Sequence, residues 1–236
     1  MMAGRCLLYY ITDRSQLPGD ENARRRALLE KIGEAAHAGV DYIQLREKDL
    51  GARALEALAR EAVRIVREEE RRASQPNTTR LLINSRTDIA LAVGADGVHL
   101  RADDVSAATV RLIWNNEGGG HSSQPKLQSS SQLTDHRPLI AVSCHTSSDV
   151  LRAQSEGADF AVFAPVFEKR GAAGIKPKGA ATLRQACAAE IPVLALGGVT
   201  QKNAACCLAA GAAGIAGIRL FQENKIEEVV RALRAL

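Results

Sequence analysis

The sequence has few aromatic residues and no strong net charge, and both absences narrow its possible functions. Aromatic residues make up 3% of the 236 residues, whereas 46% are hydrophobic, so the core must be built from Ala, Leu, Val and Ile. Such a core favours helices packed on buried parallel strands over an antiparallel sandwich. The net charge of +4 is far below that of a typical nucleic-acid-binding protein. It is compatible with small anionic metabolites as ligands.

Metal-binding cysteine motifs and long apolar runs are also absent. The five cysteines have no Cys-x-x-Cys spacing and are odd in number, which predicts reduced thiols packed in the interior. No apolar run approaches the roughly 18 residues needed to span a bilayer. Charged residues begin at Arg5, too early for a secretory signal. We therefore expect a cytoplasmic protein that binds neither membrane nor nucleic acid. The oligomeric state stays open, with a homo-oligomer as one alternative.

Short apolar segments alternate with helical patterns along the whole chain. Eight segments read as strands that are apolar on both faces, as expected for parallel strands covered by helices: 7–12, 42–46, 80–84, 97–100, 139–143, 160–167, 193–198 and 214–220. Eight strands alternating with eight helical segments over this length predict a single (β/α)8 TIM barrel that spans residues 1–236.

An internal repeat supports the barrel. Residues 38–43, 93–98, 156–161 and 210–215 each place a glycine at the end of a helical pattern, directly before a strand. They precede the second, fourth, sixth and eighth strands, so the repeat recurs every two βα units, as a quarter-barrel would.

One stretch interrupts the alternation. Residues 115–137 are rich in Gly, Ser and Gln and have no hydrophobic periodicity, which predicts a flexible insertion. His121 and His136 fall within it, and we expect both to be solvated loop residues.

Polar residues at strand ends are the functional candidates in a barrel of this type. The second strand ends in Gln-Leu-Arg-Glu-Lys, and its alternation sends Gln44, Arg46 and Lys48 to one side. A guanidinium and an ammonium that converge there favour a phosphate or diphosphate ligand. The alternative for these residues is a solvated surface charge cluster.

The next three strand ends add candidates for heterocycle and metal binding. Asn84 can hydrogen-bond a heterocycle, and Asp104 could hold a magnesium ion that bridges phosphate oxygens. Either Asp103 or Asp104 could instead cap the following helix, and for Asp103 we expect the cap. After the fifth strand, Ser143 and His145 share one face. A histidine at a barrel mouth is as often functional as structural.

The last two strand ends predict a second phosphate site. Gly197 and Gly198 follow the seventh strand, and paired glycines let backbone N–H groups approach an anion. Arg219 adds a charge at the eighth strand. The loops after strands seven and eight form the usual phosphate cup of such barrels.

Taken together, these residues resemble those of the thiamine phosphate synthase and thiazole tautomerase family. The motifs that carry the resemblance are residues 10–14, 44–48, 83–84, 94–100, 143–145, 157–159 and 197–200. They run from the first strand to the eighth. The resemblance implies a magnesium-dependent reaction that joins hydroxymethylpyrimidine diphosphate to thiazole phosphate and releases diphosphate. Diphosphate leaves first, and the thiazole nitrogen then traps the pyrimidine-stabilised cation.

The resemblance also implies roles for individual residues. The pyrimidine diphosphate would be bound by Gln44, Arg46, Lys48 and Asn84. Asp104 would be a magnesium ligand and Ser143 a diphosphate contact. The thiazole phosphate or product would be bordered by Gly198, Ile218 and Arg219.

This chain departs from the family pattern at three places. Ser85 stands where a second magnesium-binding aspartate is usual, and Arg219 stands where a small hydroxyl residue is expected. The usual Thr-x-Thr-Lys loop after the sixth strand is replaced by residues 167–172, in which Lys169 or Arg170 is the candidate substitute. Thiazole tautomerases share the barrel and use a histidine that matches His145, so a proton-transfer isomerase is the alternative function. A non-catalytic phosphate-binding barrel is the second alternative.

Overall fold

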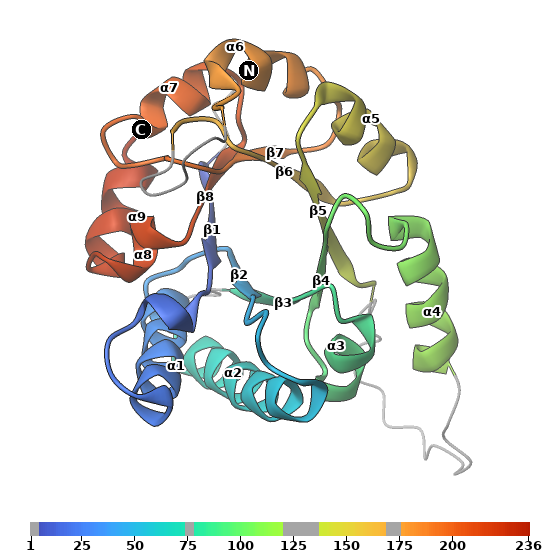
Figure 1. The fold of residues 1–236 in the computed structure, drawn as a ribbon, viewed down its shortest axis with the longest axis vertical. Coiled ribbons are helices and arrows are strands. Elements are labelled where there is room, and N and C mark those ends of the chain that lie inside the picture. The colour runs from blue at the N-terminus through green and yellow to red at the C-terminus, as the bar shows by residue number, and fades with distance from the viewer. Residues whose placement is uncertain (1–4, 74–77, 120–136, 169–175) are drawn as a thin grey trace.

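The chain folds into a closed barrel of eight parallel strands surrounded by helices, as Figure 1 shows in a computed structural model. The structure describes residues 5–73, 78–119, 137–168 and 176–236. The strands are β1 (Leu7–Ile11), β2 (Tyr42–Leu45), β3 (Arg80–Asn84), β4 (Gly97–Leu100), β5 (Leu139–Cys144), β6 (Phe160–Phe163), β7 (Val193–Ala195) and β8 (Gly214–Gly217). Each strand pairs with its sequence neighbour, and β1 pairs with β8 to close the barrel. The predicted (β/α)8 barrel is confirmed.

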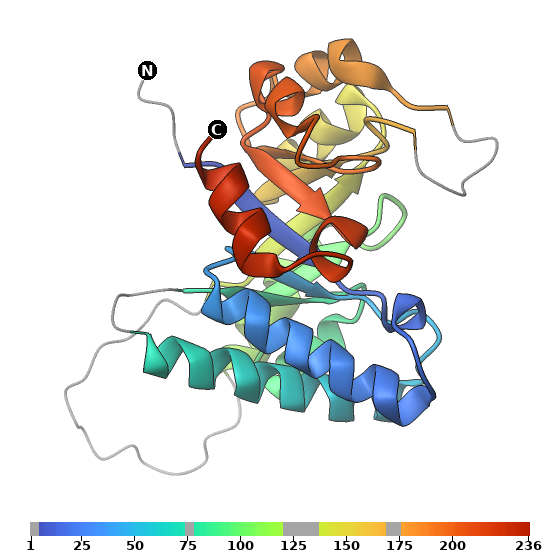
Figure 2. The same cartoon turned by 90° about the vertical axis from the view of Figure 1, so that its left-hand side faces the viewer.

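Helices form the outer layer around the strands. They are η1 (Arg14–Gln16), α1 (Glu21–His37), α2 (Ala52–Arg72), α3 (Thr87–Val93), α4 (Ala107–Gly119), α5 (Ser147–Ser155), α6 (Gly179–Ala186), α7 (Ala204–Ala209), α8 (Arg219–Gln222) and α9 (Ile226–Arg234). Figure 2 shows α1 and α2 lying side by side against the barrel. Helix α2 buries Leu55, Leu58 and Val66 on one face because apolar residues recur at helical spacing. Among the described residues, no helix has the length and apolar character to cross a membrane.

Strand alternation divides the apolar residues into two clusters. Outward-facing residues such as Leu8, Ile43, Val98 and Cys144 pack against the helices. The barrel interior is filled by a smaller cluster made of Tyr9, Ile11, Leu82, Ala141, Phe160, Val162, Leu194 and Ala216. Residues that continue the inward register past the strand ends therefore emerge at the barrel mouth.

The predicted glycine repeat is present at all four positions. Gly39, Gly94, Gly157 and Gly211 have φ of 81°, 67°, 82° and 99°, a left-handed conformation that favours glycine. Each glycine lies in the turn that connects a helix to the next strand, which is β2, β4, β6 or β8. The quarter-barrel periodicity of the sequence thus reflects a repeated local turn.

Three of the four repeats also place an aspartate two residues after the glycine. Asp41, Asp96 and Asp159 each accept a hydrogen bond from a backbone N–H of the preceding strand, at 2.7, 2.8 and 2.7 Å. Each also pairs with arginines; Asp96, for example, accepts from Arg67 at 2.7 Å and Arg80 at 3.0 Å. These aspartates therefore tie neighbouring strands together at the amino ends of the barrel.

The structure corrects several expected boundaries. Strand β6 ends at Phe163, before Pro165, which has no N–H to donate to a strand. Strand β8 ends at Gly217, and Arg219 begins helix α8 instead of extending the strand. Helix α4 continues to Gly119, so residues 115–119 of the expected insertion are helical. Residues 120–136, with His121 and His136, lie outside the described residues.

Candidate functional site

The carboxyl ends of β2 and β3 bring two predicted amide side chains together. Gln44 is buried, and its Nε2 donates to Asn84 Oδ1 at 2.8 Å. Both residues occupy inward positions in their strands. Asn84 Nδ2 donates one proton to Ser85 Oγ at 3.3 Å, which leaves its second proton as a donor and Gln44 Oε1 as an acceptor for a ligand. This is the donor and acceptor set that a nitrogen heterocycle can use.

Arg46 continues the inward register of Gln44 and lies at the barrel mouth. Burial lowers the pKa of its guanidinium from the ordinary value, while Asp13 and Glu47 oppose that shift. Its charge in turn contributes to lowering the pKa of His99, after the larger effect of burial. Within the described part of the chain, no hydrogen bond or ion pair engages its guanidinium. Arg46 is therefore a half-buried cation that is available to an anionic ligand.

Lys48 lines a cleft of about 380 Å³ at the ends of β2, β3 and β4. Two further cations, Arg86 and Arg101, line the same cleft together with Asn84 and Ser85. The sequence analysis gave neither arginine a role, although Arg86 follows Ser85 at the end of β3 and Arg101 directly follows β4. The cleft beside Gln44 and Asn84 is therefore more cationic than the 44–48 motif alone predicts.

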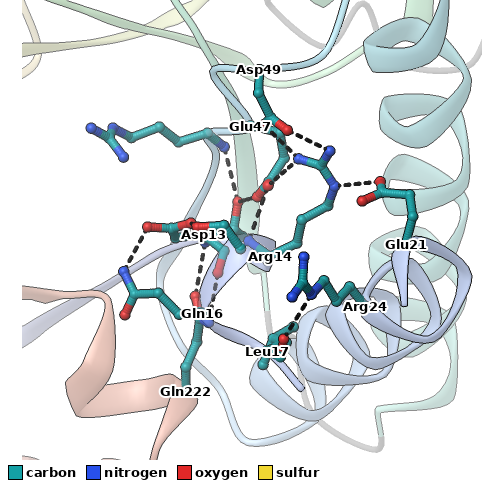
Figure 3. A network of polar contacts seen from close by, with 12 residues as sticks. Asp13, Arg14, Gln16, Leu17, Glu21, Arg24, Glu47, Asp49 and Gln222 are labelled. Carbon is teal, nitrogen blue, oxygen red and sulfur yellow. Dashed lines mark hydrogen bonds and ion pairs between the residues drawn. The ribbon is translucent and has the colours of Figure 1, made fainter. Parts of the chain in front are cut away.

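Glu47 has a structural role that the motif did not reveal. It is buried, and it accepts from the Thr12 hydroxyl at 2.6 Å and from the Arg14 backbone and side chain at 3.0 and 3.1 Å. Figure 3 shows Arg14 reaching Glu47, Asp49 and Glu21 at once. Burial raises the pKa of Glu47, and the contacts with Thr12 and Arg14 counter the rise.

This network fixes the backbone that carries the two cations of the motif. The Thr12 hydroxyl that donates to Glu47 also accepts from the Arg46 backbone N–H at 2.9 Å. Gln222 of α8 bonds Asp13 at both its N–H and its carbonyl, at 2.8 and 3.0 Å (Figure 3). The segment after β1 is thus hydrogen-bonded to the segment after β2 on one side and to α8 on the other.

Ser85 and Asp104 meet at the ends of β3 and β4. The Ser85 hydroxyl donates to Asp104 Oδ2 at 2.6 Å, and the Arg101 backbone N–H donates to the same oxygen at 2.7 Å. Arg101 Nε lies 3.5 Å from Asp104 Oδ1. Asp103 does not cap α4 as expected: it is exposed and pairs with Arg101 at 2.8 Å, while the Ser106 hydroxyl accepts from the Thr109 N–H.

Asp104 therefore offers one carboxylate to a metal ion. In the part of the chain that the structure describes, no three His, Cys, Asp or Glu side chains are grouped as a metal site. A single carboxylate still fits magnesium, because that ion keeps several waters and takes substrate phosphate oxygens as ligands. Zinc, which needs three or four protein ligands, does not fit these residues.

Ser143 lies at the end of β5, in the inward register, and contacts a histidine to which the sequence analysis gave no role. Its Oγ lies 2.7 Å from Nε2 of His99, whose Nδ1 lies 3.0 Å from the Tyr9 hydroxyl. Burial, assisted by Arg46, lowers the pKa of His99 to about 3. The signal was available: in β4, His99 alternates with Val98 and Leu100, which face outward.

His145 lies two residues beyond Ser143, directly after β5, and is exposed. Its Nδ1 lies 2.8 Å from the Ala164 carbonyl oxygen, which can only accept, so Nδ1 carries the proton when the ring is neutral. Nε2 then has no hydrogen-bond partner among the described residues and can act as an acceptor. Thr146 and Asp149 form a capping box that begins α5 directly after it.

The residues predicted to form a second phosphate site lie at the ends of β7 and β8. Gly197 and Gly198 have φ of 97° and 65°. A Cβ at Gly198 would lie 2.3 Å from the Glu168 carbonyl oxygen, so the loop after β6 excludes any larger residue there. Ile218 packs on the interior cluster, whereas Arg219 lies against Gln16, at 3.3 Å, and Glu223, at 3.7 Å. Lys169 lies outside the described residues.

A closed parallel barrel with polar side chains gathered at the carboxyl ends of its strands belongs to the (β/α)8 class. A family model described as thiamine monophosphate synthase matches residues 8–118 and 119–221. The chain therefore belongs to the thiamine monophosphate synthase family.

Individual relatives are similar over nearly their whole length. A Geobacter sulfurreducens protein is 40% identical and covers 97% of this chain and 93% of its own. The thiamine-phosphate synthase of Syntrophomonas wolfei is 33% identical and covers 97% of this chain and 95% of its own. The solved thiamine phosphate pyrophosphorylase of Pyrococcus furiosus has a TM-score of 0.72 at 26% identity and covers 97% of this chain and 94% of its own.

Proposed function

We propose that the chain is a thiamine-phosphate synthase, which joins hydroxymethylpyrimidine diphosphate to thiazole phosphate and releases diphosphate. The observation that carries the proposal is a cleft lined by three cations, Lys48, Arg86 and Arg101, beside the Gln44–Asn84 pair. A heterocycle that carries a diphosphate needs this combination of amide groups and cations. The matched family and the synthases among the relatives support the same activity.

The amide pair would hold the pyrimidine ring. Asn84 Nδ2 donates to Ser85 Oγ, whose own proton goes to Asp104, so Asn84 Oδ1 faces Gln44 Nε2 and both amide orientations are set. Asn84 Nδ2 would donate to a ring nitrogen, and Gln44 Oε1 would accept from a donor on the ring. Holding the ring in one orientation directs its reactive carbon, and the diphosphate on it, toward the cations.

The cations would serve the difficult step, the departure of diphosphate. Negative charge develops on the leaving group as its bond to carbon lengthens, and fixed cations stabilise that charge most in a partly dry site. Arg46 is half-buried, and its backbone is fixed through Thr12 and Glu47. Lys48 would contact the terminal phosphate in the cleft, and Ser143 would donate to a diphosphate oxygen.

Asp104 would hold a magnesium ion together with diphosphate oxygens and water. When bound, the ion would supply positive charge to the leaving group. The place of the usual second aspartate is taken by Ser85, whose hydroxyl donates to Asp104. The nearby Arg101 would add charge where that ligand is missing.

The second substrate would bind on the opposite side of the mouth. Gly197 and Gly198 would present backbone N–H groups to the thiazole phosphate. Ile218 would border the ring, and Lys169 or Arg219 would supply charge to the phosphate. The trapped cation would then meet the thiazole nitrogen between the two sites.

The test supplies the purified protein with both substrates and magnesium and measures thiamine phosphate and diphosphate. Stoichiometric formation of the two products is the expected result. Isomerisation of thiazole phosphate without coupling would instead identify a tautomerase, for which the free Nε2 of His145 would be the base. A protein that binds the substrates and performs neither reaction would be a non-catalytic phosphate-binding barrel.

A further inference from the structure

Three side chains form a continuous hydrogen-bonded chain from the barrel interior to its mouth. The Tyr9 hydroxyl lies 3.0 Å from His99 Nδ1, and His99 Nε2 lies 2.7 Å from Ser143 Oγ. Tyr9 is fully buried and His99 is nearly so, whereas Ser143 is half-buried. The chain therefore begins in a dry interior and ends at the site proposed for the diphosphate.

The donors and acceptors available to these three side chains determine the direction of the hydrogen bonds between them. A buried phenol that has an acceptor within reach donates to it, and for the Tyr9 hydroxyl His99 Nδ1 is that acceptor among the described residues. Nδ1 is then the acceptor of a neutral imidazole, so the proton of His99 is on Nε2. Nε2–H donates to Ser143 Oγ, which leaves the serine hydroxyl proton free.

The opposite direction leaves a buried donor without a partner. If Ser143 donated to Nε2, Nδ1–H would donate to the Tyr9 oxygen, and the Tyr9 proton would point into an apolar interior. An unsatisfied buried donor costs about 1–3 kcal/mol. The low pKa of His99, about 3, keeps the ring neutral, so the ring does not donate from both nitrogens.

We propose that Tyr9 and His99 are positioning residues that hold the Ser143 hydroxyl as a hydrogen-bond donor toward an anionic oxygen at the barrel mouth. The identity of that anion, the diphosphate, rests on the proposed function. The direction of the hydrogen bonds from Tyr9 to Ser143 does not depend on any ligand. That direction and the identity of the anion can therefore be tested separately.

The first measurement is the tautomer of His99 in the ligand-free protein. Long-range proton–nitrogen NMR of histidine-labelled protein distinguishes the protonated ring nitrogen, and the spectrum of His99→Gln assigns the signals among the five histidines. We expect Nε2 to be protonated and Nδ1 unprotonated at neutral pH. A proton on Nδ1 would overturn the proposed direction, whatever the protein binds.

The second measurement is a double-mutant cycle on the affinity for inorganic pyrophosphate with magnesium. Tyr9→Phe removes the donor that selects the tautomer, so the donating form of Ser143 becomes only partly populated. We expect affinity to fall by about two- to fivefold, in proportion to that population. In the Ser143→Ala background the same substitution should have no effect, because the residue through which Tyr9 acts is gone.

Tyr42→Phe is the matched control. Tyr42 packs edge-on against Tyr9, with ring centroids 5.9 Å apart, but makes no hydrogen bond to His99. An equal loss in Tyr42→Phe, or an undiminished loss in the Ser143→Ala background, would show a packing effect and overturn the proposal. A wild-type protein without affinity for pyrophosphate would contradict the proposed function and the role of Ser143 in it, while the tautomer would still report the direction of the chain.

Discussion

The Ser85 hydroxyl donates a 2.6 Å hydrogen bond to Asp104 Oδ2, at the position where the family pattern leads one to expect a second carboxylate. The neutral hydroxyl orients Asp104 without repelling it. Asp104 lines a smaller cleft than the one that Lys48 lines, and Arg101 lines both. The proposed magnesium ion would therefore take its carboxylate ligand from Asp104.

Asp104→Ala should lower the coupling rate by about two to three orders of magnitude, because it removes the protein's hold on the ion that stabilises the leaving group. Asp103→Ala is the matched control, since that neighbouring carboxylate is 73% exposed and pairs only with Arg101. Steady-state rates over a magnesium titration would check both. Equal rates in the two variants would remove Asp104 from the reaction.

Ser85→Asp should shift the activity curve to lower magnesium concentrations. Ser85 has φ of 58°, a left-handed conformation in which aspartate is several-fold enriched over most residues, so the backbone accepts the change. The new carboxylate would lie beside Asp104, and two like charges favour a bound cation. Ser85→Asn is the control with similar shape and no charge. A magnesium curve that shifts equally in both variants would contradict a metal at this position.

Arg46→Ala should weaken binding of the pyrimidine diphosphate by about 1.5–3 kcal/mol, the range of a charge-assisted hydrogen bond. Arg60→Ala, on the exposed face of α2, removes the same charge far from the mouth and should leave affinity unchanged. Isothermal titration measures both. Unchanged affinity in a folded Arg46→Ala protein would contradict the diphosphate assignment.

The sequence predicted the barrel, and the inward positions of Gln44, Asn84 and Ser143 follow from alternation along their strands. In a parallel barrel, one register faces inward along every strand, so inward residues at strand ends must meet at the mouth. Positions that break alternation were not predictable in this way. The segment at Arg219 continues an apolar pattern that suits a strand, but the backbone turns helical at Ile218, and a short apolar run does not distinguish the two.

The hydrogen-bond networks of the site could not be predicted from the sequence either. Glu47 belongs to the same motif as Arg46, yet it faces the other side and bonds Thr12 and Arg14, which lie over thirty residues away. Spacing along one strand identifies which residues share a face. It does not identify partners from another strand, which depend on the register between strands.

Asp96→Ala should lower the free energy of unfolding by about 2–4 kcal/mol, because it leaves a strand N–H and two arginines without their acceptor. The exposed pair of Glu227 and Arg231 provides the control, and Glu227→Ala should cost about 0.5 kcal/mol or less. Chemical denaturation at neutral pH compares the variants. Similar losses in both would mean that the aspartate of the repeat contributes no more than a surface ion pair.

Acid should destabilise the protein through His99. Its pKa falls from the ordinary value of 6.5 to about 3 in the folded state, because burial, assisted by Arg46, opposes the charged ring. Between these values the unfolded chain binds the proton and the folded chain does not, so unfolding is favoured as pH falls. The free energy of unfolding is not reduced by His99 above pH 6.5, and it falls by up to about 1.4 kcal/mol per pH unit as pH decreases toward 3.

His99→Gln should flatten this dependence, whereas His37→Gln, at a side chain that is 82% exposed, should leave it unchanged. Urea unfolding between about pH 4 and 7 measures the slopes. A His99→Gln protein whose stability falls as steeply as that of the wild type would show that the buried imidazole does not titrate below its ordinary range.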